Sequence, residues 1–249
     1  MRLAYFPGTR RKVTVAEYVS ETGAKTARTG DDYIAPDAQC PACLGNMYAV
    51  RGAPQRIQFF RHRVGLNCPA SRPAGEPYLR MTPVEPDVVG GIELRRAFIE
   101  NWRLHYSAIR TLAPCLSPEE FLTIVGSADE LRVWEHRALT ESWLPQTLVL
   151  LIDFPPWTGL RRNGVPERDL WLRFWYQGQH ETFSALWIDM QHGATLCRAS
   201  FEPPRRETDR PRYENLRKQS ELQPDRNFLN APAKYIPAFI VRTVEHGLT

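Results

Sequence analysis

Three cysteines and one histidine are the residues of this chain best suited to metal chemistry, because they recur at short distances. They follow the pattern Cys40-x2-Cys43-x18-His62-x5-Cys68. Two cysteines separated by two residues form a turn that points both thiolates at one ion, and a second pair of ligands further along completes a tetrahedron. Four such ligands leave no open coordination position. The spacing therefore predicts one structural Zn²⁺, and the alternative is a cysteine-rich loop in which His62 is only hydrogen-bonded.

The remaining cysteines, Cys115 and Cys197, stand apart from this cluster and bring the total to the odd number of five. An odd count argues against a disulfide framework, so we expect both to be small apolar residues of the interior. No run of about 18 apolar residues occurs, and the first residues lack the apolar stretch of a signal peptide. These features predict a cytoplasmic protein that has no membrane segment.

Positive charge is concentrated at the cysteine-bearing end of the chain. Residues 1 to 80 contain 12 Lys and Arg against 6 Asp and Glu, whereas residues 81 to 249 contain 20 against 22. A basic surface beside a metal site favours a polyanionic partner such as DNA or RNA. The alternative is a solvated face without a partner. The residues expected to contact nucleic acid are those near the metal ligands and in the opening hairpin: Arg10, Arg11, Lys12, Arg51, Arg56, Arg61 and Arg63.

The zinc pattern resembles the module that opens the competence protein CoiA family. The resemblance lies in Cys-Pro-Ala-Cys at 40–43, Arg51-Gly52, Phe60-Arg61-His62 and Cys68-Pro69, although Phe59 stands where that family has its first histidine. It covers about 40 of the 249 residues. In that family a nuclease domain follows, with an acid-x-lysine element. None of the four lysines here has an acid two positions before it, so we expect recognition of nucleic acid without cleavage and no enzymatic activity.

A diverged nuclease or hydrolase is the enzymatic alternative. Its catalytic groups would be His105, Glu135, His136 and Asp153. A histidine beside an acid can act as a general base. For both histidines, however, we expect positions on the exposed faces of amphipathic helices, and for Asp153 we expect a role in a turn before Pro155 and Pro156.

Element signals predict an α+β fold: an N-terminal zinc-finger module, a short helical segment and then an antiparallel β-meander. The division expected is a basic zinc-binding module over 1–80 and an α+β domain over 81–249. Within the first, a hairpin is expected from extended segments at 2–6 and 12–19, and Pro-rich residues 69–86 predict a linker or strap. Within the second, we expect three packed helices between about 87 and 140, strands between about 146 and 201, and a polar tail over 202–249. The three helices are expected over 88–114, from Ser117-Pro118-Glu119-Glu120 onward, and from a capping box at Ser127 to about 139. The strands are expected over 146–154, 170–176, 182–190 and 194–201. One further helix is expected in the tail, over 213–222.

Two further groups admit both a structural and a binding interpretation. Trp171, Trp175, Phe183 and Trp187 form an aromatic-rich stretch, for which core packing is favoured over stacking on bases. The basic stretch Arg205, Arg206, Arg210, Arg212, Arg217 and Lys218 is either a second contact region for polyanions or a solvated tail.

These observations predict a non-enzymatic, zinc-containing, nucleic-acid-binding subunit of a bacterial DNA- or RNA-handling assembly. Its size, basic character and single zinc module are loosely similar to the small zinc-bearing subunit of type IV CRISPR effector complexes. That resemblance implies contacts with target DNA, guide RNA and other protein subunits. A protein–protein adaptor that binds no nucleic acid is the second alternative. In each case, loss of the ion is expected to unfold the zinc module and to leave the β-rich half folded.

Overall fold

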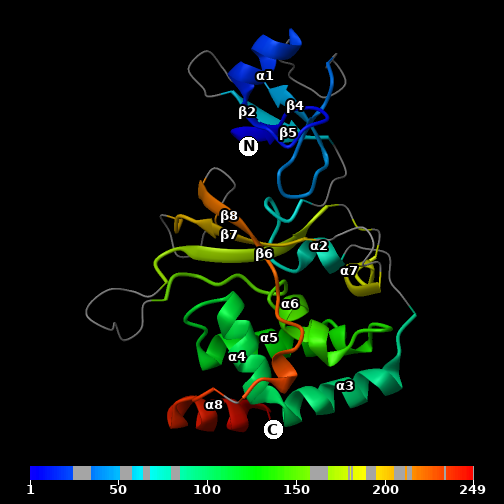
Figure 1. Ribbon diagram of the computed structural model, residues 1–249, viewed down its shortest axis with the longest axis vertical. Coiled ribbons are helices and arrows are strands. Elements are labelled where there is room, and N and C mark those ends of the chain that lie inside the picture. The colour runs from blue at the N-terminus through cyan, green and yellow to red at the C-terminus, as the bar shows by residue number, and fades with distance from the viewer. Residues whose placement is uncertain are drawn as a thin grey trace.

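The computed structural model has its elements in three tiers along one long axis (Figure 1). A small sheet unit carries the N-terminus at one end, a second sheet lies in the middle, and helices occupy the end that carries the C-terminus. The residues described by the structure are 1–24, 35–50, 58–63, 68–79, 85–157, 168–178, 180, 182–188, 195–204, 211, 215–232 and 234–248. The predicted α+β class is confirmed.

In the part of the N-terminal unit that the structure describes, a five-stranded antiparallel sheet in the order β2-β1-β3-β4-β5 is joined by one helix. The strands are β1 Leu3–Tyr5, β2 Lys12–Thr14, β3 Ala38–Gln39, β4 Asn46–Val50 and β5 Phe59–His62. The sheet curls, since Met1 and Phe60 exchange two backbone hydrogen bonds. Phe60 packs edge-on against Tyr18 in a buried core. This curvature brings the end of β5 back to the start of the chain.

The predicted hairpin of β1 and β2 is confirmed, but the predicted strand over 12–19 is wrong beyond Thr14. Helix α1, Val15–Thr22, begins there, because Thr14 and Glu17 form a capping box. Thr14 accepts a hydrogen bond from the Glu17 N–H, and the Glu17 carboxylate accepts one from the Thr14 N–H. These two hydrogen bonds satisfy the backbone N–H groups of Thr14 and Glu17 locally. In a continued strand, the same groups would need partners on a neighbouring strand. The helix ends at Gly23, which has the left-handed φ of 66°.

The second sheet is an antiparallel meander in the order β6-β7-β8. Its strands are β6 Trp171–Gln177, β7 Thr195–Phe201 and β8 Leu216–Leu222. The first two confirm predicted strands. The third lies where a helix was predicted, because pairing with β7 along its whole length outweighs the helix propensity of Arg, Lys, Gln and Glu in this segment.

Two other predicted strands are wrong. Residues 146–154 instead contain α6, Leu144–Leu148, followed by turns, and only Phe154 forms a bridge, with Leu172. The run 182–190 contains helix α7, Ala185–Ile188, with Thr182 accepting a hydrogen bond from the Ala185 N–H. Phe183 and Trp187 are buried, as is Trp175 of β6. The core interpretation is therefore confirmed for these three residues, whereas Trp171 is half-buried at the edge of the core; only Trp171 and Trp175 belong to the sheet.

The helical tier is built around a cluster of aromatic rings. Its long helices are α3 Val88–Glu100, α4 Trp102–Leu112, α5 Pro118–Glu130 and α8 Ala238–Leu248, with the short helices η1 Val133–Glu135, η2 Glu141–Trp143 and η5 Phe228–Asn230 beside them. Phe98 of α3 stacks on Phe121 of α5, and Tyr106 of α4 meets the same ring edge-on. The helices predicted over 88–114 and from Ser117 pack together as expected.

Three corrections apply to these helices. The first predicted helix breaks at Asn101 into α3 and α4. Ser127 lies in the last turn of α5 and opens no further helix, because Arg132 adopts a left-handed φ of 52° and the chain passes into η1. In the tail, α8 was not predicted, yet its Ile240 and Val244 are buried.

Candidate metal centre

Cys40 and Cys43 lie in a tight turn between β3 and β4. The turn is closed by two backbone hydrogen bonds, from the Cys40 N–H to Gly45 O and from the Leu44 N–H to Cys40 O, each 2.9 Å long. Leu44 has the left-handed φ of 56° that this geometry requires. The N–H groups of Ala42 and Gly45 donate to the Cys40 and Cys43 sulfur atoms over 3.3 and 3.4 Å. These bonds direct both sulfurs to one point.

Cys68 lies in a second turn that repeats the first in sequence. Residues 68–71 read Cys-Pro-Ala-Ser, against Cys-Pro-Ala-Cys at 40–43. The Ala70 N–H bonds to the Cys68 sulfur, just as Ala42 does to Cys40. Ser71 occupies the position of the fourth cysteine, and its hydroxyl donates to Cys68 O over 3.1 Å. Spacing predicted the four ligands, but only this short repeat indicates in the sequence that the two ligand turns are of the same kind.

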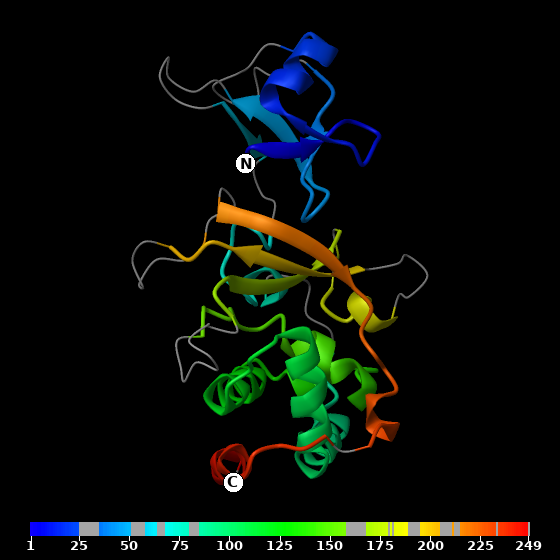
Figure 2. The same ribbon diagram turned by 60° about the vertical axis from the view of Figure 1, so that its left-hand side comes forward.

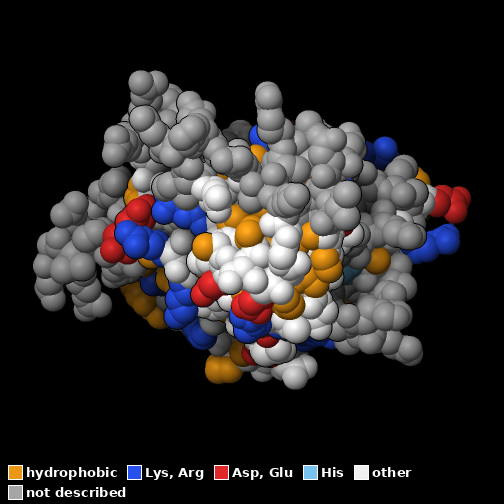
Figure 3. Space-filling view, turned by 90° about the horizontal axis from the view of Figure 1, so that it is seen from above, with side chains coloured by type: hydrophobic (Ala, Val, Ile, Leu, Met, Phe, Trp, Pro, Cys, Tyr) orange, Lys and Arg blue, Asp and Glu red, His pale blue; other side chains and the backbone are white. Residues whose placement is uncertain are grey.

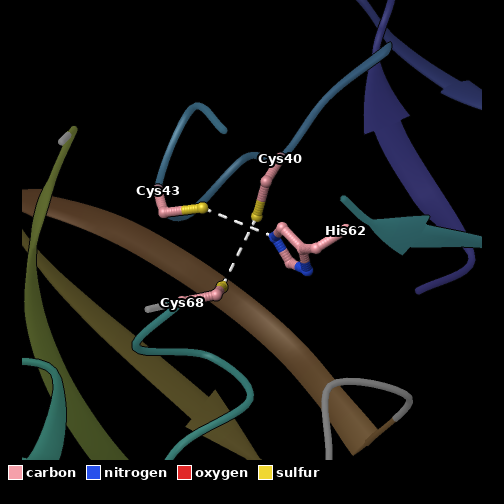
Figure 4. Close-up of side chains that lie close together, drawn as sticks. All are labelled: Cys40, Cys43, His62 and Cys68. Atoms are coloured by element: carbon pink, nitrogen blue, oxygen red, sulfur yellow. Dashed lines mark hydrogen bonds between the residues drawn. The ribbon is translucent and has the colours of Figure 1, made fainter. Parts of the chain in front are cut away.

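His62 supplies the fourth donor from the last position of β5. Its Nε2 lies 3.4 Å from the Cys43 Sγ, and Cys40 Sγ lies 3.7 Å from Cys68 Sγ (Figure 4). All four donor atoms lie within 4.8 Å of one another. A tetrahedral zinc ion with Zn–S bonds of about 2.3 Å requires sulfur atoms about 3.8 Å apart. The predicted set of four residues thus forms one cluster, and its Cys40–Cys68 edge has the length that a tetrahedral zinc ion requires.

The protonation of the thiols shows why this cluster suits a cation. Burial and the hydrogen bond to Cys43 raise the pKa of the Cys40 thiol. Hydrogen bonds from Cys40 and Cys68 hold the pKa of Cys43 well below its usual range. The bond with Cys40 lowers the pKa of Cys68, but the bond with Cys43 and burial outweigh it and raise that pKa to about 12. Three buried thiols held this close together favour a divalent cation, which would stabilise all three as thiolates.

The residues predicted to contact nucleic acid differ in their exposure and in their ion pairs. Arg63 forms a two-point ion pair with Asp37, with N–O distances of 2.8 and 2.9 Å. Arg11 pairs with Glu21 and lies over the Phe6 ring. Their charges are therefore partly neutralised within the unit. Arg10, Lys12 and Arg61 are exposed, and Arg51 and Arg56 lie outside the described residues.

Arg61 is the exposed arginine next to a metal ligand. It precedes His62 on β5, and its guanidinium lies 5.8 Å from the centre of the Phe59 ring. Successive side chains of a strand alternate between its faces, so Phe59 and Arg61 share one face while Phe60 and His62 share the other. One face of β5 thus serves the core and the metal cluster, and the other presents an arginine stacked on a phenylalanine.

Each residue of the enzymatic alternative has a separate structural partner. His105 is fully buried, which corrects the expected exposed position, and its Nε2 lies 3.0 Å from Glu141. Glu135 pairs with Arg132. His136 meets the rings of Phe183 and Trp187 edge-on. Asp153 forms a two-point pair with Arg173 rather than a turn cap. The described contacts do not join these four residues into one catalytic group.

The basic stretch of the tail lies mainly outside the described residues. Of its six members, Arg217 and Lys218 are described; both are exposed on β8, and Arg217 pairs with Glu202.

Comparison with known proteins identifies no relative. No protein-family model matches the chain, and no match was found among curated proteins or solved structures. Among the described helices, none has both the length and the apolar character needed to cross a bilayer.

Proposed function

We propose that the cluster binds one structural zinc ion and that the protein is a non-enzymatic, nucleic-acid-binding subunit of a larger assembly. The observation that carries the proposal is the closed set of three thiols and one imidazole within a basic unit. Three thiolates and an imidazole are a donor set typical of structural zinc. Such an ion fixes the backbone around it, and so positions the neighbouring side chains.

The surface proposed to contact nucleic acid centres on Arg61. This residue combines an exposed guanidinium with an aromatic neighbour, and both groups suit a polyanion that also carries stacked bases. On the described part of the N-terminal end, basic side chains stand beside acidic ones rather than forming one continuous field (Figure 3). We therefore place the contact at Arg61, supported by Arg10 and Lys12, and give the ion-paired Arg11 and Arg63 a lesser part.

A salt titration of binding tests this proposal. Arg61→Gln should weaken binding of DNA or RNA and lower the slope of log K against log salt by about one unit, because one phosphate contact is lost. Arg96→Gln is the matched control, since it removes an equal exposed charge from α3 in the helical tier. Zinc content should stay unchanged in both. An unaltered slope in Arg61→Gln would identify this surface as solvated only.

The finer form of the proposal is the target-DNA-contacting subunit of a type IV CRISPR effector complex, with guide RNA and other subunits as partners. Its support is the resemblance in size and make-up. Because the acid-x-lysine element is missing, the chain should not cut DNA in Mg²⁺ or Mn²⁺. Cleavage by the wild type that disappears in Asp153→Asn or His136→Ala would instead favour the diverged nuclease.

A protein–protein adaptor is the second candidate, and one observation favours it. Val88, Val89 and Ile92 at the start of α3 expose 47%, 70% and 68% of their surface. Adjacent exposed aliphatic residues are typical of protein interaction sites. Binding of a protein partner that is insensitive to salt and is lost in Val89→Asp would favour the adaptor.

A further inference from the structure

Both Cys-Pro-Ala turns present a proline carbonyl to the second sheet. Pro41 O accepts hydrogen bonds from the Nε2 atoms of Gln177, at 2.6 Å, and Gln219, at 3.4 Å. Pro69 O accepts from Nη1 of Arg173 at 3.5 Å, and the same nitrogen donates to Arg72 O at 2.8 Å. The turns that hold the metal ligands are thus bound by polar side chains of β6 and β8.

These side chains lie on one face of the meander. Arg173 and Gln177 are four residues apart on β6, so they point to the same side, with Trp175 between them fully buried. Gln219 is in the same cross-strand row as Arg173, through Ala199. Arg173 is only 2% exposed, and Asp153 holds it by two bonds of 2.6 and 2.7 Å. This face of the meander therefore provides the hydrogen-bond donors that bind the two turns.

The four metal donors come from two different bodies of the chain. Cys40, Cys43 and His62 belong to the N-terminal sheet. Cys68 begins a strap, residues 68–79, that includes α2, Glu76–Leu79, and is anchored on the meander. In this strap the Tyr78 hydroxyl accepts a hydrogen bond from the Tyr176 N–H, and its ring packs 5.2 Å from Phe183. Figures 1 and 2 show the first turn and the beginning of the strap lying between the two sheets, with α2 beside β6.

We propose that the metal ion is the link that fastens the N-terminal sheet to the meander, and that Gln177 and Arg173 position the paired turns for it. This inference rests on the metal part of the proposed function and not on nucleic-acid binding. Because the ion joins Cys68 to ligands of the other body, metal binding and docking stabilise each other. By linkage, docking strengthens zinc binding by the same factor by which zinc strengthens docking, so a change that weakens docking should also weaken zinc binding.

Zinc affinity of the full chain, measured by competition with a chromophoric chelator, tests the link. Gln177→Met keeps the length of the side chain but removes the bond to Pro41 O, and it should lower zinc affinity about tenfold, the lower end of the range for groups that orient metal ligands. A second variant, Arg173→Met with Asp153→Leu, removes the buried pair together and leaves no unpaired charge. Arg198→Met is the matched control, because Arg198 donates to Leu112 O from the opposite face of β7.

Hydrogen exchange provides a readout that does not depend on affinity. Removal of zinc from the wild type should speed amide exchange in β6 as well as in the two turns, while α5 keeps its protection. Weaker zinc binding in Gln177→Met, with the Arg198→Met value unchanged, supports the link. The link is overturned if both test variants fold and bind zinc with wild-type affinity, or if amide exchange in β6 does not change when zinc is removed. Either result would leave the proposed metal site itself unaffected. Absence of zinc from the wild type would overturn both.

Discussion

At the scale of single residues, His105 shows how the interior decides the charge of a side chain. Its ring is covered by Phe98 and Phe228, with ring centres 4.6 and 5.0 Å away, and its Nε2 meets the Glu141 carboxylate. Burial lowers the pKa of His105 to about 4, although Glu141 acts in the opposite direction. The histidine is therefore neutral at pH 7 and has a structural role between α4 and η2.

This buried histidine predicts a loss of stability in mild acid. The unfolded chain takes up the proton near pH 6.5 and the folded chain only near pH 4, so unfolding binds protons in that window and stability falls as the pH is lowered. Between pH 7 and pH 5 the loss should be about 1–2 kcal/mol. Urea unfolding at the two pH values measures it. His105→Gln should show a smaller loss, and the remainder would include His136, whose pKa burial also lowers. Equal losses in the variant and the wild type would contradict this role.

At the scale of elements, the sequence correctly predicted those helices, strands and turns whose conformation depends mainly on their own residues. The cap at Ser117, the strands β6 and β7, and the first hairpin were found from the sequence because their own residues specify them. Segments whose state depends on a distant partner were not. Residues 216–222 have helix-forming side chains but pair with β7, and 146–152 form an apolar run that is a buried helix and turns instead of a strand. A short apolar run does not distinguish these states.

Two serine variants compare a serine that caps a helix with one that has the same sequence pattern but does not cap. Ser117 accepts a hydrogen bond from the Glu120 N–H at 3.1 Å, so Ser117→Ala should cost about 1 kcal/mol of unfolding free energy. Ser127 heads an identical sequence pattern but lies in the last turn of the same helix. Ser127→Ala should change stability by less than about 0.5 kcal/mol. Urea midpoints of the two variants would be compared, and equal costs would show that the Ser117 cap contributes nothing particular.

At the scale of the whole molecule, the metal ligands were predictable and their setting was not. Spacing identified Cys40, Cys43, His62 and Cys68, because knuckle geometry is local. That Cys68 is anchored on the meander follows from Arg173 and Tyr78, whose hydrogen bonds reach about a hundred residues along the chain. Such contacts leave no periodic signal. The basic excess of residues 1–80 likewise did not reveal that Asp37 and Glu21 neutralise two of its arginines.

Metal removal is the whole-molecule test. The wild type should contain one zinc per chain, and Cys40→Ser should lose it, because the three remaining donors cannot complete the tetrahedron. Cys115→Ser, a change of the same kind outside the cluster, should keep it. The β-rich half is expected to remain largely folded. The contacts from Gln177 and Arg173 to the two turns add a second expectation: Cys40→Ser should unfold the N-terminal sheet and also expose the face of the meander around Trp175. A red shift of tryptophan emission in Cys40→Ser, absent in Cys115→Ser, would report that exposure. Zinc retained in Cys40→Ser at one ion per chain would contradict the ligand set itself.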